Sequence, residues 1–518
     1  MEHHGDETYF VIGEGLLGQS GQGREHLLAS ATAQAQLAPP FRFSRMGPSG
    51  VNRQLSDTIR KKLAAAMTTG PEAFSKVPSG FTYLGQFVDH DLTFDKTNVT
   101  FGQNVPPAQL LEARSPSLDL DSLYGAGPGD PGSAMFYEAD GIHLKSGTTR
   151  AGGGFPAKAG FDLQRGAGST AKAKRTAIIP DPRNDENLAV AQTHLAFIRF
   201  HNRVVDTLPN ALPIAQRFAK ARKRVTHHYQ WMLRTDLLPR ICRPSVVNDV
   251  FAHGRKIFEV SAVPTDVPTM PIEFSVAAYR LGHSMVREAY SWNKVFDEGG
   301  GTLQLLFTFT GLSGDLGGSL RLPSIWIADF RRLYDFGEAG RADLVVPKVS
   351  SNVAMRIDTK LSNPLRHVPG FPAGQDNLAF RNLTRARMVR LATGQQMAAF
   401  LRSRGVAVTT LTKAQIRDGN GGVTLDGLTG PQRDRVVKDT PLWFYVLREA
   451  EFNQGRLDGV GARIVAETFH RAMEGSATSI VREPGWRPSL GPDATTFRMV
   501  DLLLFAFQGK KSLLAPLG

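Results

Sequence analysis

A few polar residues within an apolar stretch are the first candidates for chemistry in this sequence. The stretch 81–94 carries Gln86, Asp89 and His90. If it is helical, these residues stand at i, i+3 and i+4 and share one face. Polar groups on a largely apolar helix need partners that satisfy them. The stretch therefore predicts either a functional site beside this helix or a core helix with paired polar residues.

An arginine and a glutamate mark the start of a second predicted helix. Pro182 precedes a charged turn that holds Arg183 and Glu186, and apolar spacing predicts a helix over 190–205. Arg183 and Glu186 are three residues apart and face the same way. Taken alone, the pair is typical of a surface ion pair at a helix end.

Two further stretches offer metal or cofactor chemistry. His283 stands in the strongly apolar stretch 274–286, which predicts a helix. Asp119 and Asp121 stand in a polar loop, and hard cations such as calcium prefer several oxygen ligands from one loop. Each has a plain alternative, a structural histidine in the first case and an ordinary turn in the second.

Composition narrows the class of protein. The chain has 518 residues, 41% of them hydrophobic, as in soluble globular proteins, and its single cysteine, Cys242, excludes a disulfide framework. The net charge is +13, but the basic residues are mostly scattered. No zinc-finger spacing or RNA-binding signature accompanies them, so nucleic acid is not an expected partner. A solvated basic surface favours small anionic partners instead.

The organisation expected along the chain is simple. Residues 1–38 are rich in glycine and glutamine and predict an N-terminal arm, followed by one domain over 39–515. We find no recognisable secretory signal peptide and no apolar run of about 18 residues, so we expect no membrane span and either a cytoplasmic protein or one secreted without a leader. Within the domain we expect a helix over 52–68, short strands over 302–307, a surface excursion over 146–174, and a small ribbon or surface excursion at 344–347.

Four motifs follow one another along the chain. They read Gly-Gln-x-x-Asp-His-Asp over 85–91, Asp-x-Arg-x-x-Glu over 181–186, Tyr-Arg-x-Gly-His over 279–283, and Leu-x-x-x-Asn-x-x-Arg-x-Arg over 378–387. Together and in this order they resemble the animal-type haem peroxidases of the peroxidase–cyclooxygenase superfamily, and the C-terminal helices are similar to those of bacterial members. The resemblance implies a mainly α-helical fold, a single large domain with few short strands, built around haem b.

The resemblance implies roles on the peroxide side of the haem. His90 and Arg183 take the positions of the residues that cleave the peroxide O–O bond. Gln86 resembles the residue near the halide position. Asp89 and Glu186 take the positions of carboxylates that can form ester bonds to the haem.

It also implies roles on the opposite side. His283 becomes the axial iron ligand, and Asn382 would accept a hydrogen bond from its other ring nitrogen. Arg280 and Arg385 would pair with haem propionates. Cyclooxygenases carry a radical-forming tyrosine at the position of Arg280, which argues against cyclooxygenase chemistry here.

A calcium site is implied as well. In the family, a loop before Tyr-Gly completes this site with the aspartate that follows the distal histidine. The candidate ligands in this chain are Asp91, Ser115, Ser117, Asp119 and Asp121. The carboxylate of Asp121 is a departure, because the family often has serine there.

The expected function is that of a haem peroxidase. The resemblance implies that hydrogen peroxide oxidises halides, thiocyanate or small aromatic donors, chemistry that belongs to the response to oxidative stress. Two alternatives stay open. A haem-dependent fatty-acid dioxygenase of the same superfamily would need a radical tyrosine and a long apolar channel, and a non-enzymatic basic binding protein would have lost the catalytic set.

Overall fold

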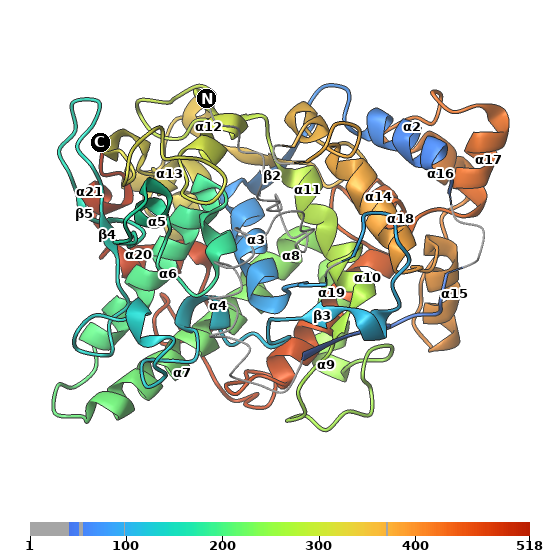
Figure 1. The fold of residues 1–518 in the computed structure, drawn as a ribbon. Coiled ribbons are helices and arrows are strands. Elements are labelled where there is room, and N and C mark those ends of the chain that lie inside the picture. Colours follow the sequence, from blue (N-terminus) through green and yellow to red (C-terminus); the bar gives the residue numbers. More distant parts are fainter. Residues whose placement is uncertain (1–40, 51–54, 98, 369–370) are drawn as a thin grey trace.

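The structure, a computed structural model, describes residues 41–50, 55–97, 99–368 and 371–518 and is mainly helical (Figure 1). The predicted arm over 1–38 lies outside the described residues. The longer helices are α2 (Asp57–Met67), α3 (Gly80–Leu92), α6 (Leu188–Asp206), α7 (Ile214–Met232), α9 (Pro244–His253), α14 (Leu378–Met388), α15 (Gly394–Ser403), α17 (Gly430–Lys438), α18 (Leu442–Glu451), α19 (Gly459–Glu474) and α20 (Met499–Ala506). The prediction of a mainly helical domain with few strands is confirmed.

Short elements connect these helices. The short helices are α4 (Asp121–Tyr124), α5 (Ala171–Arg175), α8 (Leu238–Ile241), α10 (Ile272–Ser275), α11 (Gly282–Met285), α12 (Leu303–Thr308), α13 (Phe330–Leu333), α16 (Lys413–Asp418) and α21 (Lys511–Leu514). The strands are β1 (Phe41–Ser44), β2 (Phe74–Pro78), β3 (Leu111–Glu112), β4 (Gly147–Thr148), β5 (Ala159–Asp162), β6 (Met270–Pro271), β7 (Ala289–Tyr290), β8 (Gly301–Thr302) and β9 (Val353–Met355). They form one sheet in the order β3-β1-β6 and three pairs, β2-β9, β4-β5 and β7-β8. None of the described helices is both long enough and apolar enough to cross a membrane.

Helix α3 lies near the centre of the molecule and packs against α6 and α11 (Figure 1). Twelve of its 13 residues are buried, including Gln86, Asp89 and His90. A helix buried on all sides belongs to the core, so its polar residues face protein or a cavity and not bulk water. It ends at Leu92, two residues earlier than predicted, because the backbone of Thr93 is extended.

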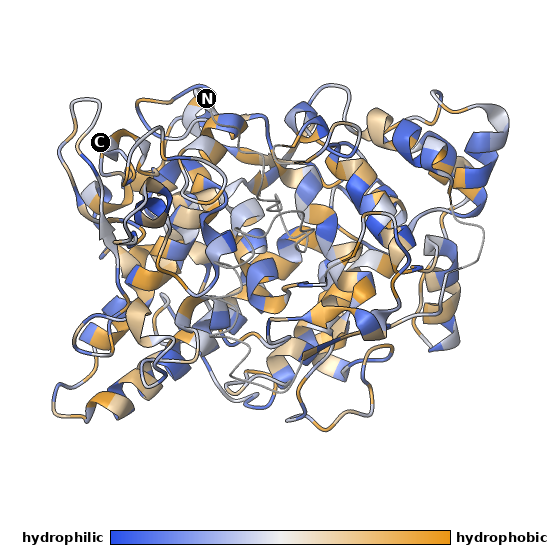
Figure 2. Cartoon of the chain, viewed as in Figure 1, coloured by the Kyte–Doolittle hydropathy of each residue, from blue (hydrophilic) through white to orange (hydrophobic). Residues whose placement is uncertain are grey.

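Helix α6 confirms the helix predicted over 190–205 and runs beside α3, α7 and α20. The Asn187 side chain accepts a hydrogen bond from the Val190 amide at 2.9 Å and so fixes where the helix begins. Apolar residues are plentiful on these central helices, whereas α7 and α17 carry more polar residues (Figure 2). The start of α6 therefore lies beside α3, with the Arg183–Glu186 turn directly before it.

Two predictions of secondary structure are wrong. The stretch 274–286 is not one continuous helix but α10, a 3-10 turn over Ala278–Leu281 and α11, since Ala277 leaves the helical region with φ −133° and ψ −75°. The stretch 302–307 is mostly the helix α12, because the Thr302 hydroxyl accepts a hydrogen bond from the Leu305 amide and starts a helical turn. At 344–347 the chain leaves a 3-10 turn (Ala342–Leu344) and continues at the surface, where Val345 is half-exposed. This segment is therefore a surface excursion.

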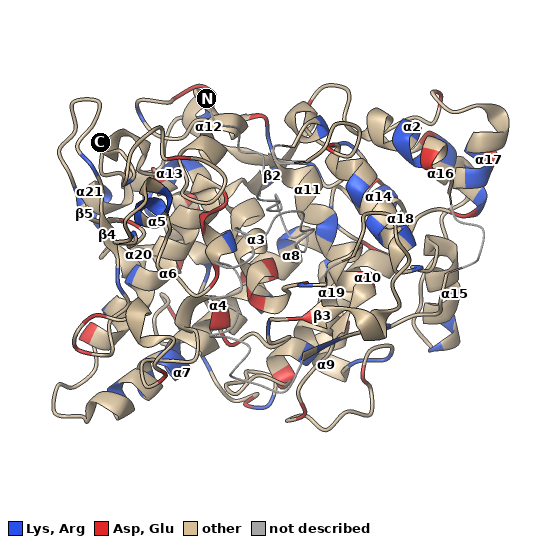
Figure 3. Ribbon diagram, viewed as in Figure 1, with Lys and Arg blue, Asp and Glu red and all other residues tan. Residues whose placement is uncertain are grey.

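Several arginine side chains and the single cysteine are buried in the interior. Basic residues lie on many elements (Figure 3), but Arg114, Arg448 and Arg471 are fully buried. The formal charge of +13 therefore includes cations that do not face solvent. Cys242 is also buried, and burial raises the pKa of its thiol well above the usual range.

Candidate active site

A cavity lies between α3 and the broken segment that carries His283. The cavity has a volume of only about 20 Å³, so side chains fill most of the space between these two walls. Gln86 and Asp89 line it from α3, and Arg280 and His283 line it from the opposite wall, with apolar side chains such as Leu281 and Met285 around them. Two stretches nearly 200 residues apart in sequence thus place four of the predicted residues around one space.

His90 has a defined tautomer. Its Nδ1 lies 2.9 Å from Oδ1 of Asn184, whose amide nitrogen lies 3.1 Å from Nδ1 of His194. Nδ1–H of His90 therefore donates a hydrogen bond to the Asn184 carbonyl oxygen, which leaves the lone pair on Nε2. Within the described residues this buried Nε2 has no hydrogen-bond partner. Burial, assisted by the positive charge of Arg183, lowers the pKa of His90 to about 3, so the ring is neutral at ordinary pH.

Arg183 is held rigidly beside His90. Its Nε and Nη2 donate to the Asp181 carboxylate at 3.0 and 2.7 Å, and Nη2 also donates to the His90 carbonyl at 3.0 Å. The guanidinium lies 4.2 Å from the centre of the Phe94 ring. Burial alone would raise the pKa of Asp181, but Arg183 and Arg114 hold it well below its usual range. A fixed positive charge therefore stands next to a neutral base.

Gln86 connects α3 to the start of α6. Its amide nitrogen donates to Glu186, and its carbonyl oxygen accepts from the Asn187 amide at 2.9 Å. Asp89 lies near both Arg280 and Arg183, yet burial raises the pKa of its carboxyl group despite these charges. Both predicted ester-forming carboxylates are therefore buried, but only Asp89 lines the cavity, whereas Glu186 lies behind Gln86.

His283 contacts the predicted partner, but in the opposite hydrogen-bonding sense. The Asn382 amide nitrogen, and not its carbonyl oxygen, lies 2.6 Å from Nδ1 of His283. The expected contact between Asn382 and His283 is present, but the Asn382 oxygen does not accept a hydrogen bond from Nδ1 in this arrangement. A half-turn of the amide exchanges its two ends, because the oxygen and the nitrogen occupy nearly the same volume. Arg280 donates from Nε to the Ser275 carbonyl at 2.6 Å, and its own carbonyl accepts from Trp443.

Arg385 does not line the cavity. It forms an ion pair with Asp95, just beyond the end of α3. Its predicted pairing with a haem propionate would therefore compete with this carboxylate.

The calcium candidates lie near one another but are engaged elsewhere. The Asp91 carboxylate accepts from the Leu120 and Ser122 amides, Asp119 contacts Ser476 and the Ala477 amide, and Asp121 pairs with Arg222. The hydroxyl of Ser117 reaches the Gly475 carbonyl at 3.5 Å, whereas Ser115 makes no side-chain hydrogen bond to another described residue. Burial and repulsion from Asp121 raise the pKa of Asp91 to about 7. In the described part of the chain, no three His, Cys, Asp or Glu side chains are grouped to hold a metal ion, so the calcium site stays a prediction.

Sequence reasoning missed three residues at this site. Asn184 acts through a tertiary contact with His90, and Asp181 acts through a local contact with Arg183. The only signal in the sequence is their position inside the Arg183 motif. Tyr279 lines the cavity, and its hydroxyl is buried without a hydrogen-bond partner among the described residues. That hydroxyl faces Gly85, where an added Cβ would lie 3.8 Å away.

The comparisons with known proteins decide the family. A family model described as animal haem peroxidase matches residues 92–475, which is most of the chain. The chain belongs to the animal haem peroxidase family. The match begins directly after the stretch with Gln86 and His90, so that stretch rests on the motif and on the geometry above. Family membership implies a haem cofactor and oxidoreductase chemistry of the peroxidase type.

Sequence relatives of this chain share only part of it. A peroxidase-like protein of Margaritifera margaritifera is 32% identical over 114 residues, 21% of this chain and 14% of that protein. The thyroid peroxidase of Rattus norvegicus is 30% identical over 192 residues, 35% of this chain and 20% of that protein. The matches span a fifth or less of the length of these relatives.

Solved structures share the fold over nearly the whole chain. Peroxidase A of Dictyostelium discoideum has a TM-score of 0.59 at 17% identity, covering 92% of this chain and 94% of that one. A fatty acid alpha-dioxygenase of Arabidopsis thaliana has a TM-score of 0.55 at 14% identity, covering 92% and 78%. Similarity at these identities shows the fold and does not separate a peroxidase from a dioxygenase.

The cavity residues fit a haem. Glycines without side chains, Gly85 and Gly282, stand on facing walls, and an added Cβ at Gly282 would meet nothing within 4 Å. The hydroxyl of Tyr279 at the cavity wall is buried without a hydrogen-bond partner among the described residues, and a bound group commonly satisfies such an atom. His90 and Arg183 are buried nearby but do not line the cavity. Imidazole, guanidinium and apolar groups in one cavity are the donor set that haem requires.

Proposed function

We propose that this protein is a haem peroxidase that reduces hydrogen peroxide beside α3. The observation that carries the proposal is the buried, neutral His90, whose Nδ1 is committed to Asn184 and whose Nε2 has no partner in the described structure. A base of this kind can take a proton and return it, provided that its ring does not rotate or change tautomer. The interaction with Asn184 supports both conditions.

In this proposal His283 holds the iron, and Arg280 pairs with a propionate. Haem would supply the electrons that split the O–O bond of hydrogen peroxide. Nε2 of His90 would accept a proton from the peroxide and give it to the oxygen that departs as water. Arg183, fixed by Asp181, stabilises the negative charge that develops on that oxygen.

The remaining predictions belong to the same proposal. Small anions or phenols would donate electrons, with Gln86 near the position for a halide, and the reaction would serve the response to oxidative stress. Asp89 and Glu186 would be the carboxylates that form ester bonds to haem, and the position of Asp89 at the cavity wall supports its assignment. A calcium ion bound by Asp91 and the 115–121 loop would relieve the repulsion among these carboxylates.

The test compares His90→Gln and Arg183→Gln with the wild-type protein after haem has been supplied. We expect the second-order rate with peroxide to fall by about 10²–10⁴ for His90→Gln and by about 10²–10³ for Arg183→Gln. The Soret band should persist in both. His253→Gln is the matched control, because that histidine is largely exposed at the end of α9. An unchanged rate in Arg183→Gln would rule out this mechanism, and a wild-type protein without a Soret band would rule out haem.

Fatty-acid oxygenation is the second candidate, and Tyr279 is the observation that favours it. Its buried hydroxyl lies at the cavity wall and stacks on Phe274 with ring centroids 4.6 Å apart. It stands one residue before Arg280, the position at which cyclooxygenases carry their radical tyrosine. Oxygen uptake with palmitate that is lost in Tyr279→Phe would support this function, whereas peroxide turnover that is unchanged in Tyr279→Phe would support the peroxidase.

A further inference from the structure

Arg183 depends on contacts from other segments for its position. Its partner Asp181 is only two residues away, so their hydrogen bonds, at 3.0 and 2.7 Å, do not fix the pair relative to α3. On one side, Nη2 of Arg183 donates to the His90 carbonyl at 3.0 Å, and the guanidinium carbon lies 4.2 Å from the centre of the Phe94 ring. On the other side, Arg114 holds the Asp181 carboxylate. These three outside contacts determine where the positive charge stands.

Arg114 reaches the pair from the loop between β3 and α4. Its side chain is 2% exposed, and its only side-chain hydrogen bond to another described residue runs from Nη2 to the Asp181 carboxylate. Oδ2 of Asp181 accepts this bond and also accepts from Nη2 of Arg183. One carboxylate oxygen thus joins two guanidinium groups in the interior, where charge-assisted hydrogen bonds are strong. A shift of Arg114 would therefore move Asp181 and, with it, Arg183.

Glu112 ties two of the outside contacts together. Its Oε1 accepts from the Arg114 amide at 2.9 Å and from the Phe94 amide at 2.5 Å. Because the Phe94 ring lies beside Arg183, one carboxyl group fixes the backbone at both supports. Glu112 lies in β3, which pairs with β1. The guanidinium of Arg183 is therefore held from a strand that belongs to neither α3 nor α6.

We propose that Arg114 is a positioning residue for Arg183. It holds the Asp181 carboxylate in place, so that the Arg183 guanidinium stays directed at the position where negative charge develops on the departing oxygen. This role rests on the proposed peroxidase function, because that function gives Arg183 a charge to stabilise. Arg114 itself touches no reacting atom and acts only through Asp181 and Arg183.

The fluoride affinity of the ferric, haem-supplied, full-length protein tests this role without turnover. In the proposed site fluoride would bind ferric haem opposite His283, where a guanidinium strengthens binding through a charge-assisted hydrogen bond. We expect Arg183→Gln to weaken fluoride binding by about 10–100-fold and Arg114→Met to weaken it by about 3–10-fold. Arg114→Lys keeps a charged donor for this single hydrogen bond and should restore most of the affinity.

A double variant separates positioning from a general structural role. If Arg114 acts through Arg183, then Arg114→Met should change the fluoride affinity by less than about twofold in a protein that already carries Arg183→Gln. A structural role would instead give the same loss in both backgrounds. The rates with peroxide of the wild-type protein, the two single variants and the double variant should follow the same pattern.

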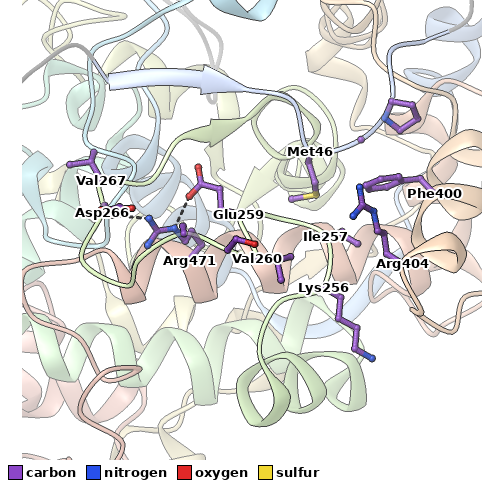
Figure 4. Close-up of a pocket in the computed structure, with 14 residues that line it drawn as sticks. Met46, Lys256, Ile257, Glu259, Val260, Asp266, Val267, Phe400, Arg404 and Arg471 are labelled. Carbon is purple, nitrogen blue, oxygen red and sulfur yellow. Dashed lines mark hydrogen bonds and ion pairs between the residues drawn. The ribbon is translucent and has the colours of Figure 1, made fainter.

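Two buried arginines elsewhere are matched controls. Arg332 donates to the Asp329 carboxylate, which also holds a neighbouring arginine. Arg471 donates to Glu259 at 2.6 Å, beside a pocket of about 730 Å³ that shares no lining residue with the cavity between α3 and α11 (Figure 4). Arg332→Met and Arg471→Met each remove a buried charge of the same kind and should leave the fluoride affinity unchanged.

Two outcomes would overturn the role of Arg114 alone. The first is unchanged fluoride affinity in Arg114→Met although Arg183→Gln weakens it, and the second is an equal loss for Arg114→Met with and without Arg183. Wild-type fluoride affinity and peroxide turnover in Arg183→Gln would overturn the proposed mechanism as well. Circular dichroism and melting temperatures show which variants are folded. If Arg114→Met does not fold, Arg114→Gln, which keeps a neutral donor, replaces it and should also weaken fluoride binding.

Discussion

At the scale of single residues, the chemistry depends on which nitrogen of His90 carries the proton. Asn184 determines this, because its own amide nitrogen is directed to His194 and only its oxygen is left to face His90. The three residues of this hydrogen-bonded chain, His90, Asn184 and His194, are all buried. In the proposed mechanism Asn184 is therefore a positioning residue that would act on peroxide through His90.

Asn184→Ala should slow the reaction with peroxide without loss of haem. We expect a decrease of about 10–100-fold, comparable to the loss of a residue that orients a metal-bound histidine. Asn184→Asp keeps an acceptor for Nδ1 but adds a negative charge, so it should raise the pKa of His90. Stopped-flow rates against pH separate the two variants. A rate that is unchanged in Asn184→Ala would show that the tautomer is set by other groups.

The pH dependence of the wild-type rate follows from the lowered pKa of His90. A protonated ring cannot accept a proton, and burial places its pKa at about 3 instead of 6.5. The rate should stay level from neutral pH down to about pH 5 and decline as the pH falls toward the folded pKa. Rates measured after a rapid pH jump avoid acid unfolding. A midpoint near the ordinary histidine value would contradict the buried, neutral state.

The partner of His283 should control the electron density at the iron. Asn382→Asp would place a carboxylate next to Nδ1, make the imidazole more electron-rich and lower the iron reduction potential. Asn382→Ala removes the contact and is the matched control for the charge. Spectroelectrochemistry of the haem-supplied proteins measures the iron reduction potential of both variants. A potential in Asn382→Asp equal to or above that of wild type would argue against His283 as the iron ligand.

At the scale of elements, α3 depends on close packing at its first residue. A Cβ added at Gly80 would lie 2.3 Å from the Tyr334 ring, and the Tyr334 hydroxyl donates to the Gly80 carbonyl at 2.9 Å. The aromatic ring thus occupies the space that a side chain would need. The direction in which α3 enters the core is set by this contact.

Gly80→Ala should destabilise the protein although alanine favours helices. Overpacking of a core contact costs about 1–3 kcal/mol, which exceeds the helix preference of alanine. Gly430→Ala is the matched control, since nothing lies within 4 Å of a Cβ added there at the start of α17. Thermal melts of the two variants should show a lower melting temperature for Gly80→Ala alone. Equal melting temperatures would mean that the Tyr334 ring can move aside for the new Cβ at little cost in stability.

The elements also show what could be predicted from the sequence. The helices α2, α3 and α6 were predictable because apolar spacing and capping residues are local signals. The break in the segment before His283 was not, because its residues are apolar throughout and a continuous helix gives the same pattern. The sequence predicts a strand in place of α12 for a similar reason, since a short apolar run has no clear period.

Part of the site could also be predicted from the sequence, namely the residues within the motifs but not their distant partners. The motifs identified Gln86, Asp89, Arg280 and His283, which the structure brings around one cavity. The motifs contain no information on Asp95 as a partner of Arg385 or on the amide direction of Asn382, because both depend on contacts between distant segments. The roles of these residues in turnover remain predictions.

At the scale of the whole molecule, the proposed calcium ion would link α3 to distant parts of the chain. Asp91 lies in α3, and Asp119 contacts residues that follow α19. If the site forms, calcium at about 100 times its Kd should add about 2.7 kcal/mol to the stability. Melting curves with calcium and with a chelator test this prediction, and Asp91→Asn should abolish the difference. No difference in the wild-type protein would show that the carboxylates keep their present partners.

The buried thiol of Cys242 has a practical consequence for a protein that would work in peroxide. Thiolates, not thiols, are the forms that peroxide oxidises, and a raised pKa keeps this sulfur protonated. We expect that the folded protein does not lose activity through oxidation of this thiol, even when no thiol reductant is added, and that it does not react with maleimide. Because the chain has no other cysteine, the extent of alkylation measures the fraction of molecules in which the protein has unfolded around Cys242.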